Sequence, residues 1–204
     1  MTLKDRIIRL IETGGPIPVS TYMQLALHDS AQGYYATRPG LGTDFITAPE
    51  VSQVFGELIG LWVVNEWRAM GAPDSFHLVE IGPGRGTLMA DALRLAYVAG
   101  GREFADAAKL TLVEPSPELR KVQAERLSDY TPSFADTLGN VPAGPMILVA
   151  NEYLDCLPAR QFRKADGQWR ECVVGLDADG ARAFGLAADE QRAPDGAAET
   201  SEAV

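Results

Sequence analysis

Short apolar segments alternate with amphipathic ones through the middle of the chain. Four of the apolar segments are short enough for strands, and they lie at 76–81, 110–113, 133–134 and 146–150. Between them, helical spacing of apolar residues runs from 87 to about 98 and from 117 to about 129. Apolar strands that alternate with amphipathic helices are typical of parallel β-α units with helices on both faces of the sheet. The pattern therefore predicts an α/β fold.

Helical spacing also precedes the first strand. Thr2 can cap one helix, and Ser20 can cap a second that ends near Leu27. A longer helix is expected from about Ala48 to Met70, because Thr47-Ala48-Pro49-Glu50 has the spacing of a capping box. Its expected buried face consists of Val51, Val54, Phe55, Leu58, Ile59 and Trp62.

The pattern changes after Leu157. The segments 160–164 and 169–176 flank Asp166-Gly167, which is a strong signal for a β-hairpin. From Ala188 the chain is polar and rich in alanine, and we expect poor order there. The sequence thus suggests four regions: a helical and active-site loop region at 1–72, an α/β core at 73–157, a hairpin insertion at 158–187 and a tail at 188–204.

Composition narrows the class of protein. The net charge of −10 argues against nucleic acid as the main partner and permits a cationic substrate, although acidity can also serve only solubility. Two cysteines form neither a disulfide framework nor a zinc site, so no metal is expected. No apolar run approaches the roughly 18 residues of a membrane span. Without a recognisable targeting segment, the expected location is the cytoplasm.

The segment after the first strand carries the strongest chemical signal. Glu80 is followed by three alternating glycines, Gly82, Gly84 and Gly86. This spacing is not the GxGxxG of dinucleotide sites, because Thr87 stands where the third glycine would be. Glycines let a backbone turn approach a ligand closely, and a carboxylate at a strand end suits a cation. The amino group of S-adenosylmethionine is such a cation, whereas the alternative is a purely structural turn.

Two further acids follow the next strands. Glu114 ends the second strand, where one carboxylate can accept hydrogen bonds from both hydroxyls of a ribose. Its alternative role is that of an acid interacting with the dipole of the helix that starts at Pro117. Asp136 follows the third strand and could accept from an adenine amino group.

A pair of carboxylates follows the fourth strand. Asn151 is placed among the cofactor contacts, and Glu152 and Asp155 could converge on one cation. A guanidinium binds carboxylates in a bidentate manner, so this pair could hold an arginine side chain for methylation. Alternatively, either acid could cap the following turn.

Five stretches together resemble the MidA family of S-adenosylmethionine-dependent methyltransferases. They are GYY at 33–35, TDFITAPEVSQVFGELIG at 43–60, LVEIGPGRGTLMADALR at 78–94, VEPSPELR at 113–120 and NEYLDCLPARQF at 151–162. The resemblance implies a class I methyltransferase fold, Rossmann-like, with an N-terminal helical extension. It implies cofactor contacts at Glu80, at the three glycines and at Glu114, and a loop with Asp44, Thr47 and Glu50 that closes over the substrate site.

The family's activity implies symmetric dimethylation of arginine in a partner protein, linked to assembly of respiratory complex I. A respiratory-complex subunit is therefore one expected substrate, and the mitochondrial matrix is the expected location in a eukaryote. Family members are longer, and only four of the usual seven strands are visible here, so we expect the C-terminal part of the fold to be missing. Methylation of a small molecule and a non-catalytic binding or assembly role are the alternatives.

Overall fold

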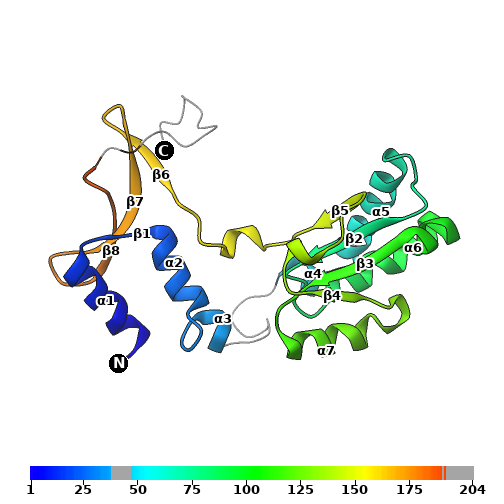
Figure 1. Cartoon of the computed structure of the whole chain (residues 1–204), viewed down its shortest axis with the longest axis horizontal. Helices are drawn as coiled ribbons and strands as arrows, with labels where there is room; N and C mark the ends of the chain where they lie inside the picture. Colours follow the sequence, from blue (N-terminus) through cyan, green and yellow to red (C-terminus); the bar gives the residue numbers. More distant parts are fainter. Residues whose placement is uncertain (38–46, 190, 192–204) are drawn as a thin grey trace. The chain divides into compact units, whose positions relative to one another are not determined.

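Residues 1–37, 47–189 and 191 are described in this computed structural model (Figure 1). The chain divides into two units. Unit 1 combines both ends of the chain, residues 1–38 and 156–204, and unit 2 is the middle segment, residues 39–155. Each unit has its own sheet and its own hydrophobic core, and each is described by itself below.

Unit 2 is built on a parallel sheet of four strands in the order β4-β3-β2-β5 (Figure 1). Its elements are α4 (Ala48–Val51), α5 (Gln53–Ala69), β2 (Phe76–Ile81), α6 (Thr87–Ala107), β3 (Ala108–Val113), α7 (Pro117–Arg126), β4 (Ser133–Ala135) and β5 (Met146–Val149). The four strands and the starts of the two helices between them lie where the hydrophobic pattern predicts them. Helix α6 runs beyond its expected end near 98, to Ala107, with a kink at Gly101. The expected α/β fold with a parallel sheet is therefore confirmed.

The strand register aligns the carboxyl ends of all four strands. Ile81 of β2 pairs with Val113 of β3, and Val113 pairs with Ala135 of β4. On the other side of β2, Glu80 pairs with Val149 of β5. The segments that follow the four strands therefore begin at one edge of the sheet, where parallel α/β folds bind their ligands.

The core of unit 2 lies between one face of the sheet and the helices α5 and α6. Leu78 and Leu112 from the strands pack there with Trp67 of α5 and Phe104 of α6. Side chains alternate along a strand, so Val79 belongs to a smaller cluster on the opposite face with Val113 and Ala135.

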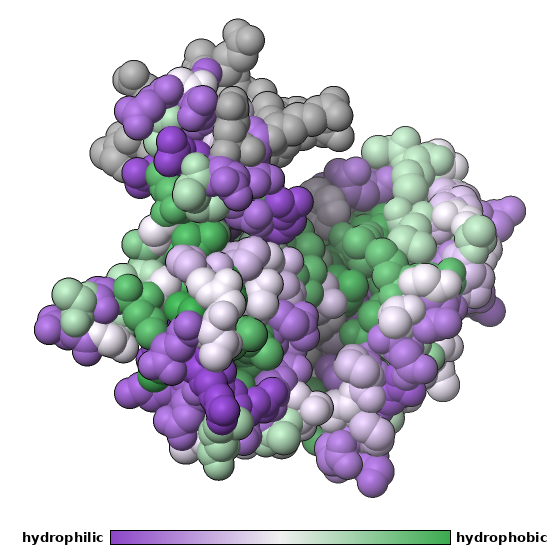
Figure 2. Space-filling view, turned by 60° about the vertical axis from the view of Figure 1, so that its left-hand side comes forward, coloured by the Kyte–Doolittle hydropathy of each residue, from purple (hydrophilic) through white to green (hydrophobic). Residues whose placement is uncertain are grey.

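The helix expected from Ala48 to Met70 is interrupted at Ser52, whose backbone is extended. The predicted buried face is also wrong: Val51, Val54, Leu58 and Trp62 are exposed, and only Phe55 and Ile59 pack against the core. Hydrophobic residues are among those at the surface in the space-filling view (Figure 2).

Close packing of two helices explains which face of α5 is buried. A Cβ atom at Gly60 would overlap the backbone of Ala92 in α6, and one at Gly56 would lie 2.6 Å from the Cβ of Asp91. The two glycines, rather than the large apolar residues, therefore set the contact face. Val63, Val64 and Trp67 continue this face and are buried.

Unit 1 packs two helices against an antiparallel sheet of four strands. Its elements are α1 (Leu3–Gly14), β1 (Ile17–Pro18), α2 (Val19–His28), α3 (Tyr34–Thr37), β6 (Phe162–Ala165), β7 (Gln168–Leu176) and β8 (Arg182–Leu186). The predicted hairpin is confirmed, with Asp166 and Gly167 both at positive φ in its turn. Helix α2 begins two residues earlier than a cap at Ser20 predicts, at Val19 after Pro18.

Candidate functional site

The glycine turn after β2 takes a conformation that requires glycine. Gly82, Gly84 and Gly86 have φ values of 65°, 54° and 76°, in the left-handed region that disfavours side chains. The turn closes on itself, because the N–H of Gly86 donates to the carbonyl of Pro83 at 2.8 Å. Helix α6 starts directly after it, at Thr87.

Glu80 is buried at the end of β2 with a carboxylate that is not fully satisfied. The residue is 2% exposed, and its Oε2 atom has no hydrogen-bond partner within the described residues. Burial raises the pKa of this carboxyl to about 8. A buried carboxylate without a partner is costly, and a cationic ligand group would remove that cost. Glu80 thus fits the amino group of S-adenosylmethionine.

Glu114 follows β3 directly and is 6% exposed. Its Oε1 accepts a hydrogen bond from the N–H of Ser116 at 2.8 Å. Burial raises the pKa of the Glu114 carboxyl, while the hydrogen bond from Ser116, the Gln123 side chain and the charge of Arg120 lower it. The carboxylate therefore lies at the same sheet edge as the glycine turn, as the ribose role requires.

Asp136, after β4, is joined to Arg120 of α7. The guanidinium donates to Asp136 Oδ1 at 2.6 Å from Nη2 and to the carbonyl of Glu114 at 2.6 Å from Nε. The Asp136 side chain is 74% exposed, so its ion pair is open to solvent. One oxygen of this carboxylate is engaged by Arg120, and the proposed contact to an adenine amino group stays a prediction.

The predicted loop residues Asp44, Thr47 and Glu50 differ in what the structure shows of them. Thr47 makes no side-chain cap to α4, so the capping box is not formed. Glu50 instead accepts a hydrogen bond from Thr87 Oγ1 at 2.7 Å, and Arg126 of α7 donates to the same hydroxyl at 2.9 Å. Glu50 is thereby tied to the end of the glycine turn, while Asp44 lies outside the described residues.

Asn151, Glu152 and Asp155 follow β5 at the same edge of the sheet. Glu152 has a φ of 48°, and both Glu152 and Asp155 are exposed. Asp155 lies in a single 3₁₀ turn, Leu154–Cys156. The two carboxylates are free to meet a cationic side chain from solvent, and their joint role as a guanidinium clamp stays a prediction.

Sequence reasoning overlooked two residues of this site. The ring of Tyr153 packs on the glycine turn so closely that a Cβ atom at Gly82 would lie 2.5 Å from its Cδ2 atom. Gln123 is fully buried, and its Nε2 donates to the carbonyl of Gly84 at 2.6 Å. The sequence did indicate Gln123, because this polar residue stands midway between Leu119 and Leu127 at the spacing of one helix face.

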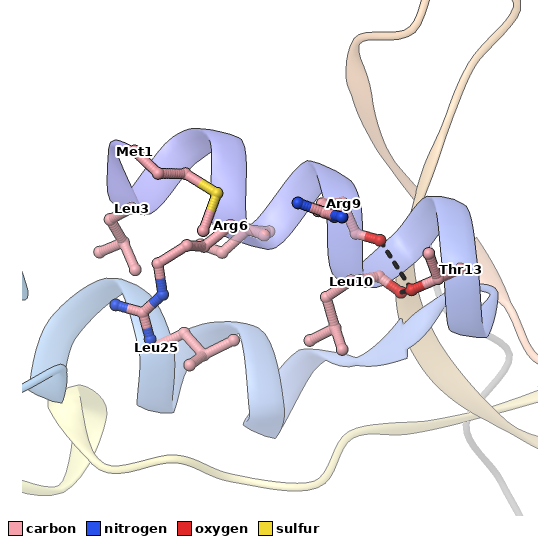
Figure 3. Close-up of a pocket in the computed structure, with 8 residues that line it drawn as sticks. Met1, Leu3, Arg6, Arg9, Leu10, Thr13 and Leu25 are labelled. Carbon is pink, nitrogen blue, oxygen red and sulfur yellow. Dashed lines mark hydrogen bonds between the residues drawn. The ribbon is translucent and has the colours of Figure 1, made fainter.

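A separate hollow of about 350 Å³ lies in unit 1 beside α1 and α2 (Figure 3). It is lined by Met1, Leu3, Arg6, Ile7, Arg9, Leu10, Thr13 and Leu25. None of these lining residues carries a carboxylate that could accept from a ribose or bind an amino group. The hollow therefore does not compete with the sheet edge as the cofactor site.

Residues 1–37, 47–189 and 191 contain neither a metal-binding group nor a membrane-spanning helix. No group of three or more His, Cys, Asp or Glu side chains there could hold a metal ion. Among the same residues, no helix has the length and apolar character needed to span a bilayer.

Comparison with known families identifies this arrangement. Residues 58–202 match the family described as "Putative S-adenosyl-L-methionine-dependent methyltransferase". The chain belongs to this methyltransferase family. The resemblance found in the five sequence stretches is thereby confirmed, and the match includes β2, the glycine turn, Glu114 and Glu152.

Relatives and solved structures give the same result. The chain is 40% identical to the mitochondrial protein arginine methyltransferase NDUFAF7 homolog of Drosophila melanogaster, over 89% of this chain and 46% of that protein. It is 39% identical to human NDUFAF7, over 82% of this chain and 43% of the human protein. A crystal structure from Burkholderia thailandensis, bound to S-adenosyl-homocysteine, matches 93% of this chain and 50% of that one, with 29% identity and a TM-score of 0.71. The chain thus spans about half the length of these proteins.

Proposed function

We propose that this chain binds S-adenosylmethionine and forms the cofactor-binding part of a protein arginine N-methyltransferase. The observation that carries the proposal is Glu80, a buried residue beside a turn of three positive-φ glycines, whose Oε2 atom has no hydrogen-bond partner in the described part of the chain. The matched B. thailandensis structure contains S-adenosyl-homocysteine, and the curated relatives are named protein arginine methyltransferases. These likenesses support the same ligand and the same reaction for this chain.

The residues present fit the cofactor in charge and in hydrogen-bonding capacity. Glu80 would hold its amino group, and the glycine turn would let its chain pass close to the backbone. Glu114 would accept from both ribose hydroxyls, Asp136 from the adenine amino group, and Asn151 would add a polar contact. When bound, S-adenosylmethionine supplies an electrophilic methyl group on a positively charged sulfur.

The substrate side of the proposal rests on Glu152 and Asp155. Both are exposed after β5 and can face a cation. We propose that they hold the planar guanidinium of an arginine through paired hydrogen bonds and orient its attacking nitrogen. Glu50 and Thr47 are proposed to contact the same substrate, together with Asp44. The net charge of −10 favours a cationic protein segment as the partner.

The finer identity of the substrate follows from the family resemblance. A respiratory-complex subunit with an exposed arginine is the proposed partner, symmetric dimethylation is the proposed product, and assistance to complex I assembly is the proposed role. The curated relatives are named as mitochondrial proteins, so for a eukaryotic source we propose the matrix. The cytoplasmic location stays a prediction for a bacterial source.

Two measurements test the proposal separately. Calorimetry with S-adenosyl-homocysteine tests the cofactor site, and we expect saturable binding to a single site. Incubation of the chain with labelled S-adenosylmethionine and an arginine-containing protein tests the reaction, with methylarginine as the expected product. Label found only in small molecules would contradict the arginine assignment, and binding without any transfer would favour a non-catalytic role.

A further inference from the structure

Gln123 occupies an unusual place for a polar side chain. It lies midway along α7, is fully buried and adjoins the proposed cofactor site. Its Nε2 atom donates to the carbonyl of Gly84 at 2.6 Å. Burial raises the pKa of the Glu114 carboxyl, and the same Gln123 side chain acts to lower it. The amide therefore binds the segment after β2 and acts on the carboxylate that follows β3.

A side-chain amide has the chemistry that this position demands. Its NH₂ group carries two donors, and both the Gly84 carbonyl and the Glu114 carboxylate are acceptors. The stem of the side chain contributes as well, because a Cβ atom at Gly86 would lie 3.5 Å from Gln123 Cγ. The Oε1 atom has no partner within the described residues. An incompletely satisfied polar group in a buried position is costly, so packing alone does not explain a glutamine there.

Neighbours on α7 make contacts of the same kind. Arg120 holds the carbonyl of Glu114 and the carboxylate of Asp136, and Arg126 holds the hydroxyl of Thr87. Helix α7 thus contacts the segments after β2, β3 and β4. Gln123 is the member of this set that is shielded from solvent, where hydrogen bonds fix geometry most firmly.

We propose that Gln123 is a positioning residue that holds the glycine turn and the Glu114 carboxylate in the arrangement that binds the cofactor. This inference rests on the proposed function of the site. Gln123 acts through Gly84 and Glu114, and it need not touch the ligand itself.

Replacement of the amide by an apolar side chain of similar length tests the inference. In Gln123→Met, we expect the affinity for S-adenosyl-homocysteine, measured by calorimetry, to fall at least about tenfold, or about 1.4 kcal/mol. The matched control is Glu125→Met, an exposed position on the same helix, which should keep the wild-type affinity. A lower melting temperature of Gln123→Met with unchanged affinity would show a purely structural role and overturn the proposal.

A double-mutant cycle with Glu114→Gln tests whether Gln123 acts through Glu114. If it does, the double variant should lose much less affinity than the sum of the two single losses. Additive losses would overturn this link. Gln123→Glu keeps the size and shape of the side chain but places a second acid beside Glu114. This variant should bind S-adenosyl-homocysteine more weakly at high pH than at low pH. This variant serves if Gln123→Met does not fold.

A measurement without ligand separates the inference from the proposed function. The charged or donor groups that act on Glu114 are Ser116 N–H, Gln123 and Arg120. Loss of the Gln123 donor should raise the pKa of Glu114, and Glu125→Met should leave this pKa unchanged. A pH titration monitored by carbon-13 NMR of the Glu114 carboxyl group measures both. If wild-type protein fails to bind S-adenosyl-homocysteine, the proposed function fails, yet this titration still decides whether Gln123 controls Glu114. An unchanged titration in Gln123→Met would overturn the inference.

Discussion

The hydroxyl of Thr87 donates a hydrogen bond to the carboxylate of Glu50 at 2.7 Å, across 37 positions of sequence. Thr87 is the first residue of α6, immediately after the glycine turn, and Glu50 lies in the short helix α4. The same hydroxyl accepts from Arg126 of α7 at 2.9 Å. One side chain therefore connects the segment that precedes the sheet with the turn that we assign to the cofactor.

The first prediction concerns this hydroxyl. Thr87→Val removes both hydrogen bonds and should lower the free energy of unfolding by about 0.5–1.5 kcal/mol per bond lost, at the lower end because the site is partly exposed. Thr87→Ser keeps the hydroxyl and should lose less. The control Thr13→Val removes an exposed hydroxyl whose hydrogen bonds in the described structure go to the carbonyls of Arg9 and Leu10 in its own helix. Urea denaturation measures all three, and equal losses at Thr87 and Thr13 would contradict the linking role.

The second prediction concerns the pH dependence that Glu80 imposes. In the ligand-free protein its pKa is raised from 4.5 to about 8, so the folded state keeps a proton that the unfolded chain releases above pH 4.5. The contribution of Glu80 to the free energy of unfolding therefore falls as the pH rises from 4.5 towards 8. Glu80→Gln should remove this loss and be more stable than wild type at pH 7, by about 1–3 kcal/mol.

The same variant should bind S-adenosyl-homocysteine more weakly, because the amide cannot neutralise an amino group. A gain in stability together with a loss of affinity is the outcome expected of a group kept for binding. Unfolding free energies at pH 5 and pH 7.5 provide the measurement, with the exposed acid Glu103→Gln as control. If the unfolding free energies of Glu80→Gln and wild type show the same pH dependence, Glu80 is not the buried group that keeps a proton in the folded state.

The third prediction separates two costs of replacing a glycine in the turn. Gly82→Ala adds a Cβ at a φ of 65° and places it 2.5 Å from the Tyr153 ring. Gly167→Ala adds a Cβ at a φ of 79° with no atom within 4 Å. Each should lose about 1–2 kcal/mol of stability from the backbone alone. Only Gly82→Ala should lose further stability and cofactor affinity, as calorimetry and thermal melting can show.

The hydrophobic pattern was sufficient for the four strands and their order along the chain, because β2 and β3 are short and mostly apolar and carry an acid at or just after their carboxyl ends. It was insufficient for α5. Large apolar residues at helical spacing indicated a buried face, yet contact with α6 depends on Gly56 and Gly60, which carry no hydrophobic signal of their own. Helix packing of this kind depends on the shape of the partner, which the sequence of one helix does not contain.

The candidate site, too, was predictable from the sequence only in part. Acids at strand ends were predictable, because parallel strands bring their carboxyl ends together wherever the strands are placed correctly. The tie between Glu50 and Thr87 was not, since their spacing along the chain carries no periodic signal. Gln123 was within reach of prediction, as a polar residue in the apolar stripe of α7, but such an interruption identifies a buried partner only after the facing Gly84 carbonyl is known.

The last prediction concerns the substrate. If Glu152 and Asp155 hold a guanidinium, Glu152→Gln should reduce methyl transfer to an arginine-containing protein at least about a hundredfold, comparable to the loss of one electrostatic group in other active sites. Its affinity for S-adenosyl-homocysteine should remain close to that of the wild type, because the two buried carboxylates proposed to hold the cofactor, Glu80 and Glu114, lie at the ends of β2 and β3. Replacement of the target arginine by lysine should also prevent transfer, since a point-charge ammonium does not match two carboxylates as a planar fork does. Glu125→Gln is the matched control, and transfer to lysine or undiminished transfer by Glu152→Gln would exclude the clamp while leaving the cofactor site as proposed.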